Sequence, residues 1–261
     1  KVGVGNVDTV QQLPYLTDAG LGQTAKIGLI VLQTDQTIEA ELGQILALDG
    51  VACYHSRIAN AMQVTPQTLA QMQTDLPIAA RLLPNAFAFD AIGYGCTSGA
   101  TIIGEAQVAQ IILAEHPNAK VSNPLTACKA ACKALKLNNM ALLTPYTPQV
   151  TQALSDRLYA SGINMTRTGY FNIDDDFEVG RVDEASIFNA IITLGSHQDC
   201  EGVFVSCTSL RVLDTILKAE QQLGKPVISS NQALAWHLLR LSGITAQPTH
   251  FGRLFNHSLA H

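Results

Sequence analysis

Two stretches of this chain carry the same short motif at the same point of the same strand-to-helix pattern. Residues 90–98 read Asp-Ala-Ile-Gly-Tyr-Gly-Cys-Thr-Ser, and residues 201–209, at an offset of 111, read Glu-Gly-Val-Phe-Val-Ser-Cys-Thr-Ser. Two further pairs of segments match in the same order, at offsets near 113 and 108: 27–34 with 141–147, and 121–123 with 229–231. Matching landmarks in one order indicate an internal duplication into two similar halves.

Strand-length apolar runs alternate with helix-like patterns along most of the chain. The expected strands cover residues 26–32, 88–95, 140–144, 202–206 and 226–229. The expected helices cover residues 37–48, 98–115, 148–161, 209–223 and 231–241. This alternation is typical of βαβ units and parallel sheets. We therefore predict an α/β fold of two similar Rossmann-like parallel-sheet halves related by a pseudo-twofold axis.

The pairing of segments also predicts the domain boundaries. The first half is expected to contain residues 1–136 plus 230–261, with an N-terminal appendage and a C-terminal helix that returns to pack on it. The second half is expected to contain residues 137–229. The paired strand ends would then face each other across a cleft, because ligands of open α/β sheets bind at the carboxyl ends of the strands.

Composition and charge narrow the classes of partner. The net charge is −5 and the 16 Lys and Arg residues form no basic block, which argues against nucleic acid as a partner. No apolar run approaches the ~20 residues of a membrane span, so no membrane partner is expected. Residues 1–26 have no apolar signal-peptide core, so the six cysteines are interpreted as reduced thiols of a cytoplasmic protein.

The two cysteines of the repeated motif, Cys96 and Cys207, each follow a predicted strand and precede a predicted helix. The partial positive charge of a helix N-terminus lowers the pKa of a thiol and favours the reactive thiolate. The free N–H groups there, with the neighbouring hydroxyls, can hold a carboxylate. The predicted substrate-binding hydroxyls are those of Thr97, Ser98, Thr208 and Ser209. The alternative is that both cysteines are buried packing residues.

A facing pair of cysteines permits one type of reaction in particular. One sulfur starts as thiolate and takes a proton or attacks carbon, while the other starts as thiol and donates a proton from the opposite face. Two identical groups close together do not both ionise, so one cysteine is expected as thiolate and the other as thiol without any additional residue. Racemisation needs such a pair, and cis–trans isomerisation of an activated alkene can use it.

The other four cysteines and the acidic run give weaker evidence of a catalytic or metal site. Cys128 and Cys132, four residues apart, can share a helix face, but two soft ligands do not make a metal site, and none is expected. Cys53 and Cys200 are interpreted as structural. The acidic run 174–176 is interpreted as a solvated loop rather than a lid or a cation site. No glycine-rich phosphate-binding motif occurs, so no cofactor is expected.

Four segments together resemble a known group of enzymes: residues 95–99, 142–146, 205–209 and 229–236. The twin cysteine motifs resemble those of the aspartate/glutamate racemase superfamily. The remaining segments are similar to one branch of it, which contains maleate cis–trans isomerases, arylmalonate decarboxylases and ectoine-utilisation racemase-like proteins. The resemblance covers residues 26–243.

This resemblance implies a two-domain α/β fold with pseudo-twofold symmetry, no cofactor, and Cys96 and Cys207 as the catalytic pair. In maleate isomerases the first cysteine attacks the alkene and the second handles the proton. The tyrosine matching Tyr146 contacts substrate there. Arylmalonate decarboxylases have glycine in place of the first cysteine, so the presence of Cys96 disfavours decarboxylation of that kind.

One position departs from the maleate isomerase pattern. An asparagine after the first strand helps to bind a substrate carboxylate in those enzymes, whereas this chain has Asp35, preceded by Thr34. An ionised aspartate repels a second carboxylate and attracts an ammonium group. The run resembles the ectoine-utilisation group, whose substrates would be amino acids related to diaminobutyrate. Asp35 can alternatively cap the following helix.

Three further residues are candidates for the cleft. Arg57 and Arg211 are carboxylate partners or surface ion-pair residues, and Asn172 is expected to reach the substrate. The predicted function is a cofactor-independent isomerase, a racemase, epimerase or cis–trans isomerase, acting on a small carboxylate such as an amino acid of ectoine degradation or maleate. A carbon–carbon lyase and a catalytically silent ligand-binding protein are the alternatives. A homo-oligomer, dimer or tetramer, is also expected.

Overall fold

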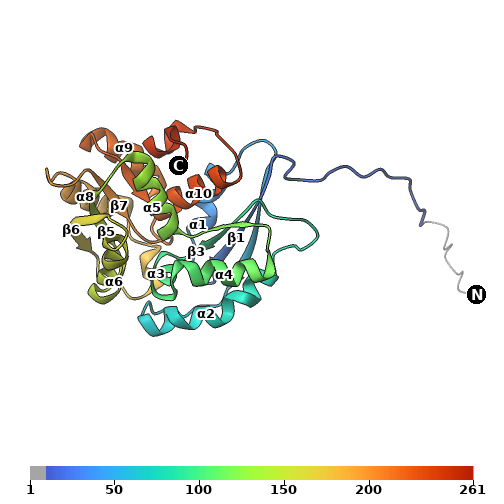
Figure 1. The fold of residues 1–261 in the computed structure, drawn as a ribbon, viewed down its shortest axis with the longest axis horizontal. Coiled ribbons are helices and arrows are strands. Elements are labelled where there is room, and N and C mark those ends of the chain that lie inside the picture. The colour runs from blue at the N-terminus through green and yellow to red at the C-terminus, as the bar shows by residue number, and fades with distance from the viewer. Residues whose placement is uncertain (1–9, 261) are drawn as a thin grey trace, which may run out of the picture.

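The computed structural model describes residues 10–260 and contains two four-stranded sheets with helices packed around them (Figure 1). The strand order is β2-β1-β3-β4 in the first sheet and β6-β5-β7-β8 in the second. Every strand pairing within these sheets is parallel. The predicted fold class, an α/β fold with two similar parallel-sheet halves, is confirmed.

The strands of the first sheet are β1 (Ala25–Leu32), β2 (Val51–Ile58), β3 (Ala91–Gly95) and β4 (Lys120–Ser122). Those of the second are β5 (Asn139–Thr144), β6 (Asn164–Tyr170), β7 (Gly202–Val205) and β8 (Val227–Ser229). The α-helices are α1 (Ile38–Ile45), α2 (Pro66–Arg81), α3 (Thr97–Ile103), α4 (Glu105–Glu115), α5 (Pro124–Leu135), α6 (Pro148–Tyr159), α7 (Asp176–Val179), α8 (Glu184–Gly195), α9 (Leu213–Leu223) and α10 (Ser230–Leu241). Two 3-10 turns follow, η1 (Thr249–Phe251) and η2 (Arg253–Asn256).

The residue pairing within the two sheets can be compared with the offsets of the sequence repeat. The pairings of β1 with β3 and of β5 with β7 agree with offsets of 113 and 111. The pairings of β3 with β4 and of β7 with β8 place corresponding residues of β4 and β8 at an offset of 106 residues, rather than the expected 108. The N-cap of α5, Asn123, therefore corresponds to the N-cap of α10, Ser229, and Ser230 has no serine counterpart in the first half.

Two predicted helices differ from the structure at the cysteine motifs. The helix expected over 98–115 is two helices, because Gly104 lies between them with a φ of 98° that only glycine adopts readily. The helix expected to begin at residue 209 begins at Leu213, because the backbone of Cys207 has a positive φ of 111° and turns away from a helical path. Only Cys96 therefore stands at a helix N-terminus.

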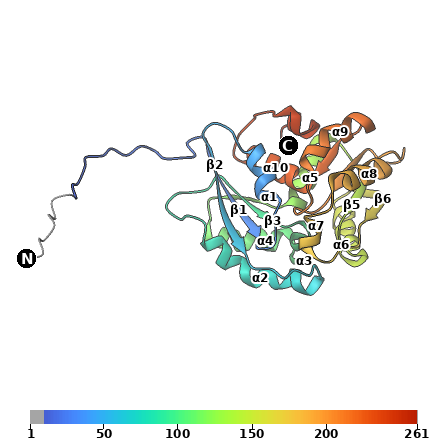
Figure 2. The ribbon, with the colours of Figure 1, turned by 180° about the vertical axis from the view of Figure 1, so that it is seen from behind.

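Helices α5 and α10 lie side by side where the two halves meet, and both views show them there (Figures 1 and 2). Helix α10 follows the last strand of the second sheet, and it contacts β3 and β4 of the first. All but one of its residues are buried, from Ser230 to Arg240. The domain boundaries expected at residues 136 and 229 stay a prediction.

The segment before β1 has no regular structure from residue 10 to residue 20 and extends away from the body (Figures 1 and 2). Its large apolar side chains are exposed, Leu16 to 99%. Residues 1–9 of the expected N-terminal appendage lie outside the described residues. Among residues 10–260, no helix is both long and apolar enough to span a membrane.

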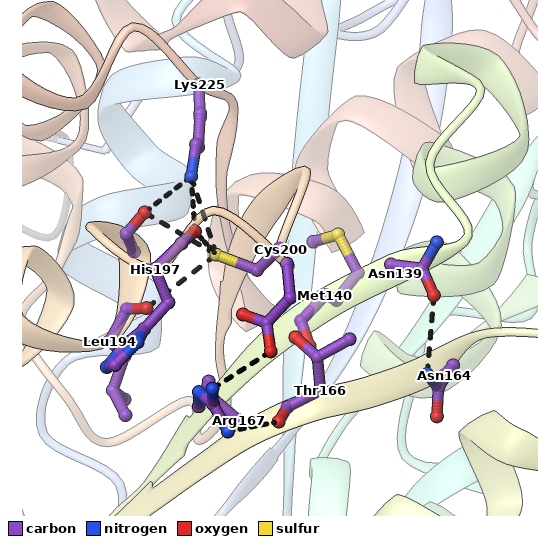
Figure 3. A network of polar contacts seen from close by, with 11 residues as sticks. Asn139, Met140, Asn164, Thr166, Arg167, Leu194, His197, Cys200 and Lys225 are labelled. Atoms are coloured by element: carbon purple, nitrogen blue, oxygen red, sulfur yellow. Dashed lines mark hydrogen bonds and ion pairs between the residues drawn. The ribbon is translucent and has the colours of Figure 1, made fainter.

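Cys200, interpreted from the sequence as structural, lies just beyond the C-terminus of α8 and is buried. Its thiol contacts the carbonyl oxygens of Leu194, Gly195 and His197 at 3.6, 3.4 and 3.2 Å. The ammonium group of Lys225 donates to two of these carbonyls at 2.8 and 2.7 Å (Figure 3). A cation there stabilises the negative end of the helix dipole, so the cluster closes α8.

A buried carboxylate joins the two halves. Glu41, on α1, accepts the backbone N–H groups of Val212 and Leu213 at 2.7 and 2.9 Å, and thereby caps α9 from the other half. Its second oxygen accepts the side-chain amide of Asn231 at 2.8 Å. Burial is the main influence on this group and raises the pKa of Glu41 to about 7.

This contact predicts how stability depends on pH. Because the folded state holds the proton of Glu41 more tightly than the unfolded chain, the free energy of unfolding falls as pH rises from about 4.5 to about 7, and this contribution is constant above that. Substitution Glu41→Gln removes that part of the slope in urea unfolding measured across this window. Glu39→Gln, at a half-buried position of the same helix, is the control and keeps the slope. Equal slopes in Glu41→Gln and the unaltered protein would contradict this prediction.

Candidate active site

The carboxyl ends of β3 and β7 face a common cavity with about 400 Å³ of empty space, some of it open to solvent. Cys96 and Cys207, which follow these strands, both line it. The sequence-predicted residues on its wall are Cys96, Thr97, Ser98, Tyr146, Cys207, Thr208 and Ser209. The structure thus brings together, on the wall of one cavity, seven residues predicted from the two halves.

Cys96 is the N-cap residue of α3. Its sulfur accepts the backbone N–H of Gly99 at 3.1 Å and lies 3.6 Å from the hydroxyl of Ser98. The side chain is only 3% exposed. Burial raises the pKa of the Cys96 thiol to about 12, and these two donors lower it by less than burial raises it.

Cys207 stands in a loop rather than at a helix start. Burial raises the pKa of its thiol well above the usual value, and the charge of Asp176 raises it further. The N–H of Ser209 and the hydroxyl of Tyr146 oppose these effects. The expectation that a helix N-terminus lowers both thiol pKa values is therefore wrong, because loss of water outweighs the few local donors.

Asp176 is a wall residue that the sequence did not identify. The run 174–176 was expected to be a solvated loop, but Asp176 is 4% exposed and lines the cavity. Its carboxyl accepts the hydroxyl of Ser209 at 2.9 Å and that of Thr34. Burial raises the pKa of Asp176. Thr34 thus contacts Asp176 and does not line the cavity itself.

Asp35 lies beside the cavity, 3% exposed, and is not a wall residue. Its Oδ1 accepts the N–H groups of Thr37 and Ile38 at 2.8 and 2.9 Å, the geometry of a helix-capping carboxylate. The nearby Thr208 hydroxyl donates to the carbonyl oxygen of Gly95 at 3.3 Å, which leaves Oδ2 of Asp35 without a partner among the described residues. Burial raises the pKa of Asp35, and its charge raises the pKa values of both cysteines.

Two loops from different halves meet at the cavity. The N–H of Val64 donates to the carbonyl of Asp174 at 2.8 Å, and the N–H of Asp176 donates to the carbonyl of Met62 at 3.0 Å. Residues 60 to 64 supply several wall positions, including Asn60 and Gln63. The sequence offered no signal for this contact, because it joins two loops far apart in the chain.

Three predicted residues lie away from the cavity wall. Arg57 donates to backbone carbonyls including that of Asp35, at 3.1 Å, and pairs with Glu39 at 2.6 Å. Arg211 donates to the carbonyl of Val182 at 3.0 Å. Asn172, expected to reach the substrate, is exposed and is not a wall residue. Among the residues described, no lysine, arginine or histidine lines the cavity, and Asp176 is the one ionisable group there besides cysteine and tyrosine.

Comparison with known proteins identifies the family to which this chain belongs. The model of the arylmalonate decarboxylase family matches residues 105–255, which include Cys207 and begin after Cys96. The chain belongs to this family. A segment of 136 residues is 32% identical to arylmalonate decarboxylase of Bordetella bronchiseptica, over 51% of this chain and 56% of that protein.

Several relatives that match over most of the chain are maleate isomerases. Maleate isomerase of Geobacillus stearothermophilus is 25% identical over 88% of this chain and 97% of its own. The structure of Pseudomonas putida maleate isomerase with maleate has a TM-score of 0.83 at 22% identity, covering 91% of this chain and 99% of that one. A liganded double mutant of arylmalonate decarboxylase has a TM-score of 0.80 at 26% identity, covering 89% and 99%. The resemblance seen in the sequence is confirmed.

Gly99 permits the contact that holds the sulfur of Cys96. A Cβ atom at this position would stand 2.5 Å from the hydroxyl of Tyr94 and 2.9 Å from the Cys96 sulfur. We therefore expect Gly99→Ala to destabilise the protein by about 1–3 kcal/mol in urea unfolding.

The matched control is Gly43→Ala, on α1, where the added Cβ atom meets open space. In a helix this change stabilises by about 0.4–1 kcal/mol. Equal effects of the two substitutions would contradict the packing described for Cys96.

Proposed function

We propose that this family member is a cofactor-independent isomerase in which Cys96 and Cys207 exchange protons with a small carboxylate bound between them. One observation carries the proposal: both cysteines, from equivalent strand ends of the two halves, line a single cavity. A packing role alone would not require two thiols from equivalent positions on the wall of one cavity.

The walls supply the parts of such a reaction. The free N–H groups at the start of α3 and the hydroxyls of Thr97 and Ser98 hold the substrate carboxylate. One sulfur, as thiolate, takes the proton from the α-carbon, and the electron pair left behind is delocalised into the carboxylate. The other thiol gives its proton to the opposite face of that carbon. One S–H bond forms and one breaks, so the pair ends with its protonation reversed.

The charges around the cavity favour a substrate with an ammonium group. Asp176 on the wall and Asp35 beside it are both buried, and no cationic side chain lines the cavity within the described residues. Both carboxyls raise the pKa values of the two thiols. An ammonium group placed among them is attracted to the carboxylates and lowers the thiol pKa, which helps a thiolate to form. The preferred substrate is thus an amino acid, and racemisation the reaction, with acids related to diaminobutyrate as the specific candidates.

Cis–trans isomerisation of a dicarboxylate is the second candidate. Four curated relatives are maleate isomerases, at 22–25% identity. One solved structure, of the Nocardia farcinica enzyme, contains a succinylcysteine intermediate, at 24% identity. In this chain such a substrate would need Asp35 and Asp176 to be protonated, since a dianion beside two carboxylates is repelled. Burial raises the pKa of both groups and so shifts them toward that form.

The first test replaces each thiol. Cys96→Ser and Cys207→Ser should each lower turnover by about 100- to 10,000-fold, the range found for a lost acid–base group. Cys53→Ser, away from the cavity, is the control and keeps its activity. Circular dichroism checks that the variants are folded. Full activity in both cavity variants would sink the proposal.

The second test identifies the substrate class. Proton NMR in D₂O follows a panel of diaminobutyrate derivatives, aspartate, glutamate, maleate and substituted malonates. We expect loss of the α-proton signal from an amino acid, and Asp176→Asn should weaken its kcat/KM by about tenfold or more, the value of one lost charge contact. Fumarate formation without amino-acid exchange would support the second candidate instead. Release of CO₂ from malonates would indicate a lyase.

A further inference from the structure

Residues 229–231 repeat a landmark of the sequence but have no part in the chemistry described so far. Ser229 caps α10, and its side chain accepts the N–H of Gln232 at 3.1 Å. Ser230 and Asn231 begin the helix and are 0% and 1% exposed. Neither lines the cavity, yet the polar atoms of both are directed to the two cysteine motifs.

The hydroxyl of Ser230 joins the motifs directly. It accepts the backbone N–H of Cys207 at 3.0 Å and lies 2.7 Å from the hydroxyl of Thr97, the residue after Cys96. All of these atoms are buried. A single oxygen therefore links the backbone of one cysteine to the neighbour of the other.

Asn231 contacts the loop after β7 at Thr208, the residue that follows Cys207. Its amide nitrogen donates to the carbonyl of Thr208 at 2.9 Å and to Oε2 of Glu41 at 2.8 Å. The other oxygen of Glu41 holds the N–H groups of Val212 and Leu213, where the loop ends. The segment 207–212 is thus attached near both ends to groups of the first half and of α10.

Cys207 needs such support because of its backbone. Its φ of 111° lies in a region that residues with side chains seldom adopt, and such a conformation persists only where the surroundings hold it. The attachment exists once, since the register of the sheets aligns Ser230 and Asn231 with Pro124 and Leu125, which lack these polar groups.

We propose that Ser230 and Asn231 are positioning residues, which hold Cys207 in its strained conformation and at a fixed separation from Cys96. The proposal rests on the proposed function, in which the two sulfurs must face opposite sides of one carbon. Misplacing a reacting group by about 1 Å costs about 100-fold in rate.

The test uses the full chain with Ser230→Ala and a matched buried serine, Ser122→Ala, whose hydroxyl contacts His237 at 2.7 Å and neither cysteine motif. We expect kcat to fall about 100-fold in Ser230→Ala with KM within about threefold, and to be unchanged in Ser122→Ala. A second readout needs no substrate: peptide-resolved mass spectrometry of iodoacetamide alkylation gives the pH profile of each thiol. The profile of Cys207 should shift in Ser230→Ala only.

The proposal is overturned if Ser230→Ala and Ser122→Ala have the same kcat and the same pH profile of Cys207 alkylation. This holds whatever effect the two substitutions have on the melting temperature. If the unaltered protein turns over no acid of the panel, the proposed function fails while the alkylation profile still decides this inference. If Ser230→Ala does not fold, the same alkylation profile is measured for Glu41→Gln. This substitution weakens the hydrogen bond that holds the side-chain amide of Asn231. A smaller shift of the Cys207 profile in Glu41→Gln supports the proposal, and an unchanged profile overturns it.

Discussion

The removal of two thiols from water is the constraint on which the chemistry of this site depends. Cys96 and Cys207 are both buried, and burial outweighs every hydrogen-bond donor around them in setting their pKa values. Two buried carboxyls add to the effect rather than offset it. Burial therefore favours the thiol over the thiolate at both cysteines, and in the proposed reaction the positive charge that ionises one of them arrives with the substrate.

Contacts across the two halves give the site its shape. The Ser230 hydroxyl joins the two cysteine motifs, Glu41 caps a helix of the opposite half, and Asp176 receives hydroxyls from both. Each of these groups is polar and buried, so each costs free energy unless its partner is in place. The cavity thus exists only when both halves are correctly packed, which links the alignment of the sulfurs to the fold.

The duplication in the sequence was sufficient to predict the paired sheets and six wall residues, because strand ends in parallel sheets follow from local patterns. The seventh, Tyr146, was predicted only from the family resemblance. The edge strands β2, β4 and β6 were missed, since their mostly exposed or half-exposed residues lack the buried apolar run of a central strand. Asp176 was missed for a different reason: its burial depends on Thr34 and Ser209, which are distant in the chain. The thiol pKa was misjudged because the helix N-terminus is a local feature, whereas desolvation is set by the whole fold.

The proposed chemistry predicts how the ultraviolet absorbance of thiolate changes with pH, with and without an amino-acid ligand. The free protein should show no thiolate from Cys96 or Cys207 near neutral pH. Binding of an amino acid should produce the signal of one thiolate, and this signal should be lost in the double variant Cys96→Ser, Cys207→Ser. A cavity thiolate already present in the free protein at neutral pH, or a bound amino acid that leaves the absorbance unchanged, would contradict the proposed chemistry.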